Sequence, residues 1–231
     1  MERKFWFCTL IFLGFVLILT ISCSKNDDNK PSDAVSVTDI DGNVYHKVTI
    51  GTQVWMKENL NVSRYRNGDI IPQEIEPAAW LNLTIGAWCY YENNTANGSV
   101  YGKLYNWYAV NDPRGLAPTG WHVPSDTEWA TLTTYLGGQN VAGAELKEAG
   151  TTHWMSPNTG ATNRSGFTAL PGGVRQKYGD FFEVRQAGFW WSSTEAAGEA
   201  AWYRQLYYDT GGIGRPGIDK KQGYSVRCLK D

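Results

Sequence analysis

Large aromatic residues recur among glycines along most of this chain, and this pattern constrains the fold more than any other feature. The sequence holds 11 Trp and 13 Tyr beside 25 Gly in 231 residues. So many flat side chains exceed what helix-on-helix packing uses, but they can hold short strands and loops together when their polar tips find partners. We therefore predict a core built largely from tryptophans, including Trp121, Trp129 and Trp191.

The N-terminus has the pattern of an export signal. Arg3 and Lys4 precede an uncharged apolar run over residues 5–21, and the small residue before the break is followed by Cys23. This is the layout of a secretory signal, and the cysteine resembles the acylation site of bacterial lipoproteins. We predict a lipoprotein signal peptide over residues 1–22 and lipidation of Cys23. The alternative is an uncleaved membrane anchor, although the run falls short of the roughly 20 residues that span a bilayer.

Residues 23–36 form a polar stretch with few apolar side chains, which predicts a flexible tether. Lys25, Asp27 and Asp28 resemble the surface-export signal of Bacteroidota lipoproteins, which favours an outer-membrane protein displayed at the cell surface over one kept in the periplasm. Removal of residues 1–22 takes away two cations and one anion, so the net charge changes from −2 to −3. A slightly acidic domain has no electrostatic reason to bind nucleic acid.

Two of the four cysteines belong to the expected mature domain. Cys8 lies in the apolar run and Cys23 is the lipidation site, which leaves Cys89 and Cys228. An even pair in an oxidising compartment favours a disulfide. Closing so long a loop would stabilise the fold by about 4–5 kcal/mol. The alternative is a pair of buried thiols.

Local patterns predict two helices among short strands, which together make an α+β domain. Residues 35–60 alternate as strands do. Ser125 and Glu128 form a capping box that starts a helix, and a second helix is expected over residues 141–149 with Asn140 as its N-cap. Apolar or aromatic runs between glycine-rich turns predict strands at residues 87–91, 167–170, 189–193, 202–208 and 224–229.

Three phrases carry a family resemblance: GWHVPSDTEW at residues 120–129, FWWSSTE at 189–195 and GYSVRC at 223–228. Together they resemble the Fibrobacter succinogenes major paralogous domain of Bacteroidota lipoproteins. At longer range they are similar to C-type-lectin-like and formylglycine-generating-enzyme folds. The resemblance implies one domain over residues 37–231, with two helices, short antiparallel strands and long loops.

The residues give little support to catalysis. The resemblance implies enzyme relatives that use a copper-binding cysteine pair or iron held by histidines, but no second cysteine lies near Cys228 in the sequence. His46, His122 and His153 are scattered rather than spaced along one helix face. The glycine-rich residues 160–173 lack the Lys-Ser/Thr ending of a phosphate loop, and no Gly-x-Ser-x-Gly elbow occurs. We predict no enzyme and no cofactor.

The calcium-dependent sugar site of C-type lectins is not matched either. Glu76 and Pro77 are followed by Ala78 rather than Asn, and no Trp-Asn-Asp triplet occurs. Structural calcium is left open, because loop carbonyls and Asn or Asp side chains can supply oxygen ligands without a recognisable motif.

The ribbon between the second and third phrases is expected to bind a ligand. Large aromatics beside charged residues on glycine-rich loops are typical of recognition surfaces, and the resemblance implies ligand binding in this region. The alternative is a ribbon whose Tyr and Arg are only packed or solvated. Trp191 and Val226 are expected to be buried. All of the candidates except Trp202 and Lys221 are expected to include exposed residues grouped on one side of the domain. The candidate ligand-binding residues are Trp202, Tyr203, Arg204, Tyr207, Tyr208, Asp209, Arg215, Asp219 and Lys221.

These observations predict a binding or adhesion module without catalytic activity. Its lipid would anchor it to the membrane, and its unknown surface ligand would be a glycan or a protein. A structural component of a surface appendage or envelope complex is one alternative. An enzyme of the formylglycine-generating type is the other.

Overall fold

The computed structural model describes Met1 and residues 36–231, and residues 36–231 belong to one compact unit. The predicted signal peptide over residues 1–22, the lipidation site Cys23 and nearly all of the tether over 23–36 lie outside the described residues. Within the described part of the chain, no helix is both long and apolar enough to cross a membrane.

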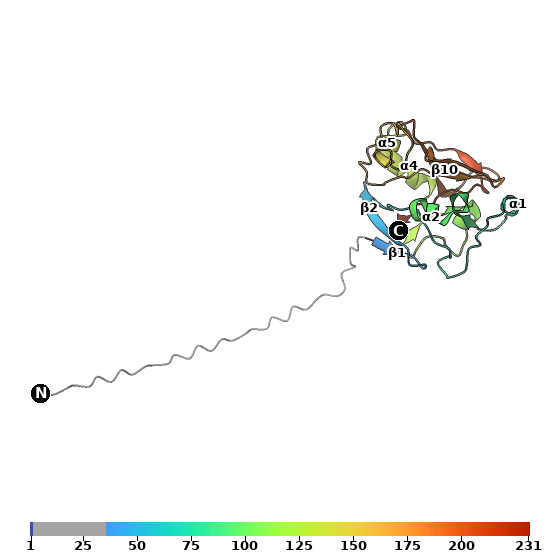
Figure 1. Ribbon diagram of the computed structural model, residues 1–231, viewed down its shortest axis with the longest axis horizontal. Helices are drawn as coiled ribbons and strands as arrows, with labels where there is room; N and C mark the ends of the chain where they lie inside the picture. Colours follow the sequence, from blue (N-terminus) through green and yellow to red (C-terminus); the bar gives the residue numbers. More distant parts are fainter. Residues whose placement is uncertain (2–35) are drawn as a thin grey trace. The chain divides into compact units, whose positions relative to one another are not determined.

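Short strands, arranged in four sheets, form most of the regular structure of the described residues (Figure 1). The strands are β1 Ser36–Thr38, β2 Val44–Ile50, β3 Gln53–Met56, β4 Trp88–Cys89, β5 Leu104–Tyr105, β6 Trp121–His122, β7 Gly172–Arg175, β8 Phe181–Val184, β9 Ala187–Glu195, β10 Ala200–Tyr207, β11 Gly217–Asp219 and β12 Leu229–Lys230.

The largest sheet ties the two ends of the domain together. Its strand order is β1-β2-β3-β12-β6, and Leu229 of β12 lies opposite Trp55 of β3 on one side and His122 of β6 on the other. A second antiparallel sheet has the order β11-β10-β9, and two hairpin-like pairs, β4-β5 and β7-β8, complete the set. In Figure 1 the C-terminus accordingly lies beside β1 and β2.

Five short α-helices and one 3-10 turn lie between these strands in the described residues. This confirms the α+β class, whereas the expectation of two helices was wrong. The helices are α1 Pro77–Leu81, η1 Tyr91–Asn93, α2 Thr95–Tyr101, α3 Trp107–Val110, α4 Asp126–Tyr135 and α5 Ala142–Leu146. Most are a turn or two long, so sequence periodicity had little length over which to show itself.

Helix α4 begins as predicted. The Ser125 hydroxyl accepts a hydrogen bond from the Glu128 N–H at 3.3 Å, and the Glu128 carboxylate accepts one from the Ser125 N–H at 2.7 Å. This reciprocal pair satisfies two amides that the first helical turn would otherwise leave free. Trp129 and Leu132 then bury the apolar face of the helix.

Helix α5 differs from its prediction at both ends. Asn140 is not its N-cap, because the helix begins only at Ala142, where the N–H groups of Val141 and Ala142 donate to the Gly138 carbonyl. The helix stops at Leu146 rather than near residue 149, since Lys147 is extended and Glu148 donates its N–H to the carbonyl of Ala169.

The predicted strands are confirmed at residues 35–60, 189–193 and 202–208, and in part at 87–91. Residues 167–170 are not a strand, because Thr168 has a φ of 56° and breaks any ladder. Residues 224–229 run extended through the core, but only Leu229 belongs to a strand.

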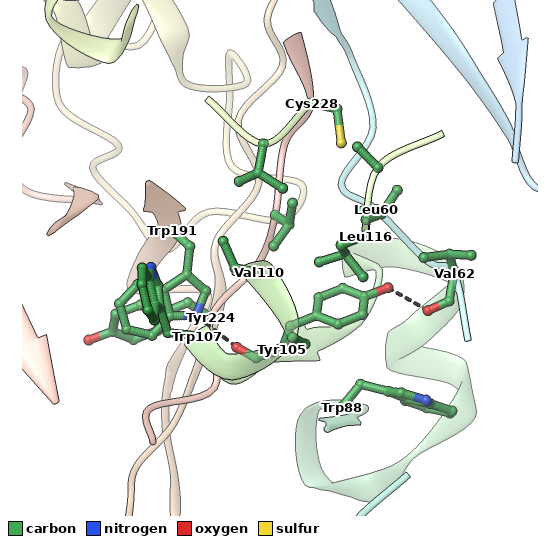
Figure 2. Packing of buried hydrophobic residues seen from close by; sticks show 14 of the residues in the cluster. Leu60, Val62, Trp88, Tyr105, Trp107, Val110, Leu116, Trp191, Tyr224 and Cys228 are labelled. Carbon is green, nitrogen blue, oxygen red and sulfur yellow. Dashed lines mark hydrogen bonds between the residues drawn. The ribbon is translucent and has the colours of Figure 1, made fainter. Parts of the chain in front are cut away.

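The core is built largely from aromatic side chains, as predicted, and many of their polar tips reach backbone carbonyls, although Trp129 Nε1 and the Tyr65 hydroxyl have no hydrogen-bond partner among the described residues. Trp121, Trp129 and Trp191 are at most 4% exposed, and Val226 is fully buried. In the largest core cluster the Trp191 indole donates to the Tyr105 carbonyl at 2.7 Å, and the Tyr105 hydroxyl donates to another backbone carbonyl at 2.7 Å (Figure 2).

Buried cations also hold the fold together, which the sequence did not suggest. Lys147 is fully buried and donates to three backbone carbonyls, at 2.8 to 3.0 Å, two of which belong to Tyr207 and Thr210 at the end of β10. Burial lowers the pKa of Lys147 to about 8. Arg175 and Arg227 are likewise at most 1% exposed and bonded to backbone carbonyls.

The predicted disulfide between Cys89 and Cys228 is not formed in this structure, where both are free buried thiols. Cys89 lies in β4 among the apolar residues of a small cluster around Trp80, whereas Cys228 lies in the largest core cluster. Burial raises the pKa of each thiol to about 12, which keeps both protonated and unreactive. The two cysteines belong to different core clusters, so an even number of cysteines in the domain did not predict a disulfide correctly.

We expect both thiols to resist maleimide in the folded protein and to react after unfolding. Burial of Cys89 and Cys228 blocks access by the reagent, and neither sulfur is in a disulfide. Peptide mapping by mass spectrometry under non-reducing conditions measures this directly. A peptide joined through Cys89 and Cys228 in exported protein would contradict the structure.

Candidate binding face

Strand β10 points the predicted ligand-binding residues to opposite sides of its sheet. Tyr203 is 7% exposed and packs with Phe189 and Tyr224, whose rings are stacked at 5.0 Å. Arg204 is 2% exposed and points to α4. Neither residue is therefore among the exposed members expected on one side of the ribbon, because alternate residues of a strand face opposite sides and both sides of β10 are covered.

Asp126, the first residue of α4, joins two arginines of the ribbon. Its carboxylate accepts hydrogen bonds from Arg204 Nη1 at 2.8 Å and from Arg215 Nε and Nη2 at 2.8 and 2.6 Å. Arg204 also donates to the Asp126 carbonyl at 3.0 Å. Burial alone would raise the pKa of Asp126, but hydrogen bonds from Arg215 and Arg204 outweigh it and hold the pKa below its usual value. The group is an ionised carboxylate held between two cations.

Arg215 is the exposed member of this group, and it is held in one orientation. Its side chain is 43% exposed, and its guanidinium carbon lies 3.8 Å from the ring centroid of the half-buried Trp202. The Nε–Nη2 edge is occupied by Asp126, whereas Nη1 has no hydrogen-bond partner among the described residues. A guanidinium with one edge fixed and the other free is well suited to bind an outside acceptor.

A cavity of about 240 Å³ opens beside this pair. We call Asp126, Trp202, Arg204, Arg215 and this cavity the arginine cleft. Sequence reasoning missed Asp126, which it assigned only to the start of a helix. It also missed the α4 side of the cavity, since nothing local indicates which helix lies against a strand. The lining residues are Ala130, Thr133, Thr134, Gly138, Gln139, Arg204, Ile213 and Arg215.

The other predicted residues lie away from the arginine cleft, so they do not form one face. Tyr207 is half-buried edge-on to Phe189, and Tyr208 is half-buried against the core cluster around Trp129. Asp209 is exposed at the end of β10. At the opposite end of the sheet, Asp219 lies 3.1 Å from Lys177 and Lys221 donates to the Leu81 carbonyl at 2.8 Å.

The first family phrase forms a second polar site, which the sequence did not reveal. The His122 ring lies between two carboxylates, with Nδ1 2.7 Å from Asp231 and Nε2 2.9 Å from Glu128. Burial opposes the charged ring, but hydrogen bonds to Asp231 and Glu128 outweigh burial and raise the pKa of His122. His122, Ser125 and Glu128 line a cavity of about 440 Å³.

We expect the free energy of unfolding to decrease slightly as the pH rises above about 6.5, the usual pKa of His. The folded-state pKa of His122 is raised, so its ion pairs stabilise fully below that pH and are lost as the pH passes the folded pKa. The side chain is 36% exposed, which limits the effect to less than about 1 kcal/mol. Urea unfolding of the wild type, H122Q and the control H46Q measures it. The step should vanish in H122Q alone, and an unchanged step there would show another origin.

The histidines are not gathered into a metal site. His46 contacts Glu58 and His153 contacts Glu148, each at 2.8 or 2.9 Å. In the part of the chain that the structure describes, no three His, Cys, Asp or Glu side chains are arranged to hold a metal ion.

Comparison with known proteins identifies one family, and the matched part of the sequence contains every residue of the arginine cleft. The model of the Fibrobacter succinogenes major domain matches residues 48–230, a span that contains all three phrases. No curated protein and no solved structure gives a match. Because the family model covers most of the sequence, this chain belongs to the Fibrobacter succinogenes major domain family.

Proposed function

We propose that this protein is a lipid-anchored binding or adhesion module, displayed at the surface of the outer membrane, which recognises a glycan or a protein without catalysis. The observation that carries the proposal is the exposed Arg215, held by Asp126 on the face of Trp202 at the edge of a cavity. Arginine and aromatic residues ordered before binding lose little conformational freedom when a ligand arrives. The lipid anchor rests on the sequence around Cys23.

We further propose a C-type-lectin-like topology for the domain. Its support is the similarity of the three phrases to that superfamily and the strand order that brings both ends of the domain into one sheet. In this arrangement the ribbon between β9 and β12 lies far from the anchor in sequence and is free to carry a ligand site.

Replacing Trp202 with Ala should weaken ligand binding about tenfold, or about 1–2 kcal/mol, because the indole supports Arg215. The full chain, kept in detergent, would be applied to arrays of glycans and of envelope proteins, with and without calcium. Tyr178→Ala is the matched control, since Tyr178 is an exposed aromatic outside the cavity.

The binding proposal fails if no ligand is retained on either array, or if W202A binds as the wild type does while Y178A does not. Stable co-purification with appendage subunits, unaffected by W202A, would instead favour a structural component. Circular dichroism of both variants checks that the fold persists.

A further inference from the structure

We propose that the arginine cleft binds the carboxylate of an acidic saccharide at the free edge of Arg215. This inference rests on the proposed binding function and specifies its ligand. It starts from the geometry of one side chain. Arg215 donates to Asp126 through Nε and Nη2, while its guanidinium lies against the Trp202 ring, which restricts its orientation. The remaining edge presents Nη1 and the second N–H of Nη2, a spacing that matches the two oxygens of a carboxylate.

The charges in the cleft favour an anion. Arg204 and Arg215 share one carboxylate, since Asp126 is the only acidic partner that either has among the described residues. One positive charge is therefore left uncompensated. Arg204 lines the cavity and is only 2% exposed, so water screens the charge of its guanidinium less than the charge of an exposed arginine. Non-specific attraction of polyanions is not expected, because the whole chain carries a net charge of −2.

The lining of the cavity favours a sugar over a peptide. Thr134 and Gln139 offer side chains that can both donate and accept, as sugar hydroxyls do. The Thr133 hydroxyl can still accept, since it donates its hydrogen to the Trp129 carbonyl at 2.8 Å. Ala130 and Ile213 are the only apolar side chains among the lining residues, too few to hold a large apolar side chain of a peptide.

The cavity volume of about 240 Å³ is below the roughly 300–1,000 Å³ of pockets that enclose drug-sized ligands. One ring at the end or in the middle of a saccharide chain would fit it. An acidic peptide would be expected instead to pair with the edge strand β11.

The test uses fluorescently labelled galacturonate hexamer and sialic acid tetramer, each compared with its methyl ester, in which the charge is masked. The full chain in detergent is titrated at low and at physiological salt. We expect at least one free acid to bind about tenfold or more tightly than its ester, the effect of losing one charge-assisted pair. R215Q should abolish that preference. R164Q, a change at a 76%-exposed arginine outside the cavity, should retain it.

Three results would overturn the inference. The first is equal binding of the acids and their esters, or no binding of either. The second is a loss of affinity in R164Q as large as that in R215Q. The third is a glutamate-rich peptide that competes better than either saccharide. If neutral glycans bind in a way that depends on Trp202, and acid and ester bind equally, the proposed binding function is supported and only the proposal of an acidic ligand is wrong. Circular dichroism of R215Q distinguishes lost binding from lost fold.

Discussion

Replacing Asn59 with Leu is expected to lower the free energy of unfolding by about 3–5 kcal/mol, although the two side chains have the same number of heavy atoms and the same branching. Asn59 Oδ1 accepts hydrogen bonds from Trp190 Nε1 at 2.9 Å and from Arg227 Nε and Nη2 at 3.1 and 2.8 Å. Leucine would leave a fully buried guanidinium without its main side-chain acceptor and an indole N–H without a partner. Buried donors left unpaired cost the full desolvation of each group. Urea unfolding measures the loss.

Two variants separate the hydrogen bonds from the change of side chain. Asn59→Asp keeps an acceptor for Arg227 and adds an opposite charge, so it should lose less than N59L, even though it gives up the bond to the Tyr101 carbonyl. Asn140→Ala should stay within about 0.5 kcal/mol of the wild type, because Asn140 is exposed and caps no helix. A small loss in N59L would mean that Arg227 finds other acceptors when Asn59 is absent.

Local signals in the sequence predicted local structure well. The capping box placed the start of α4 at the correct residue, since both of its hydrogen bonds join residues three apart. Trp121, Trp129 and Trp191 were assigned to the core because large aromatic surface favours burial whatever the fold. The predicted end of α5 was wrong at Lys147, whose side chain bonds the carbonyls of the distant Tyr207 and Thr210. The predicted strand over residues 167–170 was wrong at Thr168, whose φ of 56° the alternation of apolar residues did not indicate.

Charged residues in the core were the main feature that the sequence could not reveal. Arg204 was predicted to be a ligand-binding residue of the ribbon, but Asp126, 78 residues away, supplies a partner with which it is buried. Arg227 belongs to the third family phrase, yet its burial depends on three oxygens from two distant segments, those of Met56 and Asn59 on one and that of Phe167 on the other. The arginine cleft was found in part, through Trp202, Arg204 and Arg215, because the ribbon carries aromatic and basic residues together.

Replacing Trp191 with Ala should cost about 3–5 kcal/mol of unfolding free energy, the usual range for truncating a buried aromatic. Trp191 is fully buried in β9, with ring centroids 4.7 Å from Tyr224 and 6.3 Å from Tyr203. Its removal would open a cavity beneath β10, the strand that carries Trp202 and Arg204. Thermal or urea unfolding of purified variants measures the cost.

The conservative variant Trp191→Phe divides this loss into two parts. Phenylalanine retains most of the buried ring surface but not the 2.7 Å hydrogen bond to the Tyr105 carbonyl, which still accepts from the Tyr224 N–H. Because that carbonyl keeps one partner, W191F should lose only about 1–2 kcal/mol. If W191A and W191F lose the same amount, the hydrogen bond outweighs ring packing. If W191A loses less than about 1 kcal/mol, the core closes around the missing ring and does not hold β10 in the way the structure indicates.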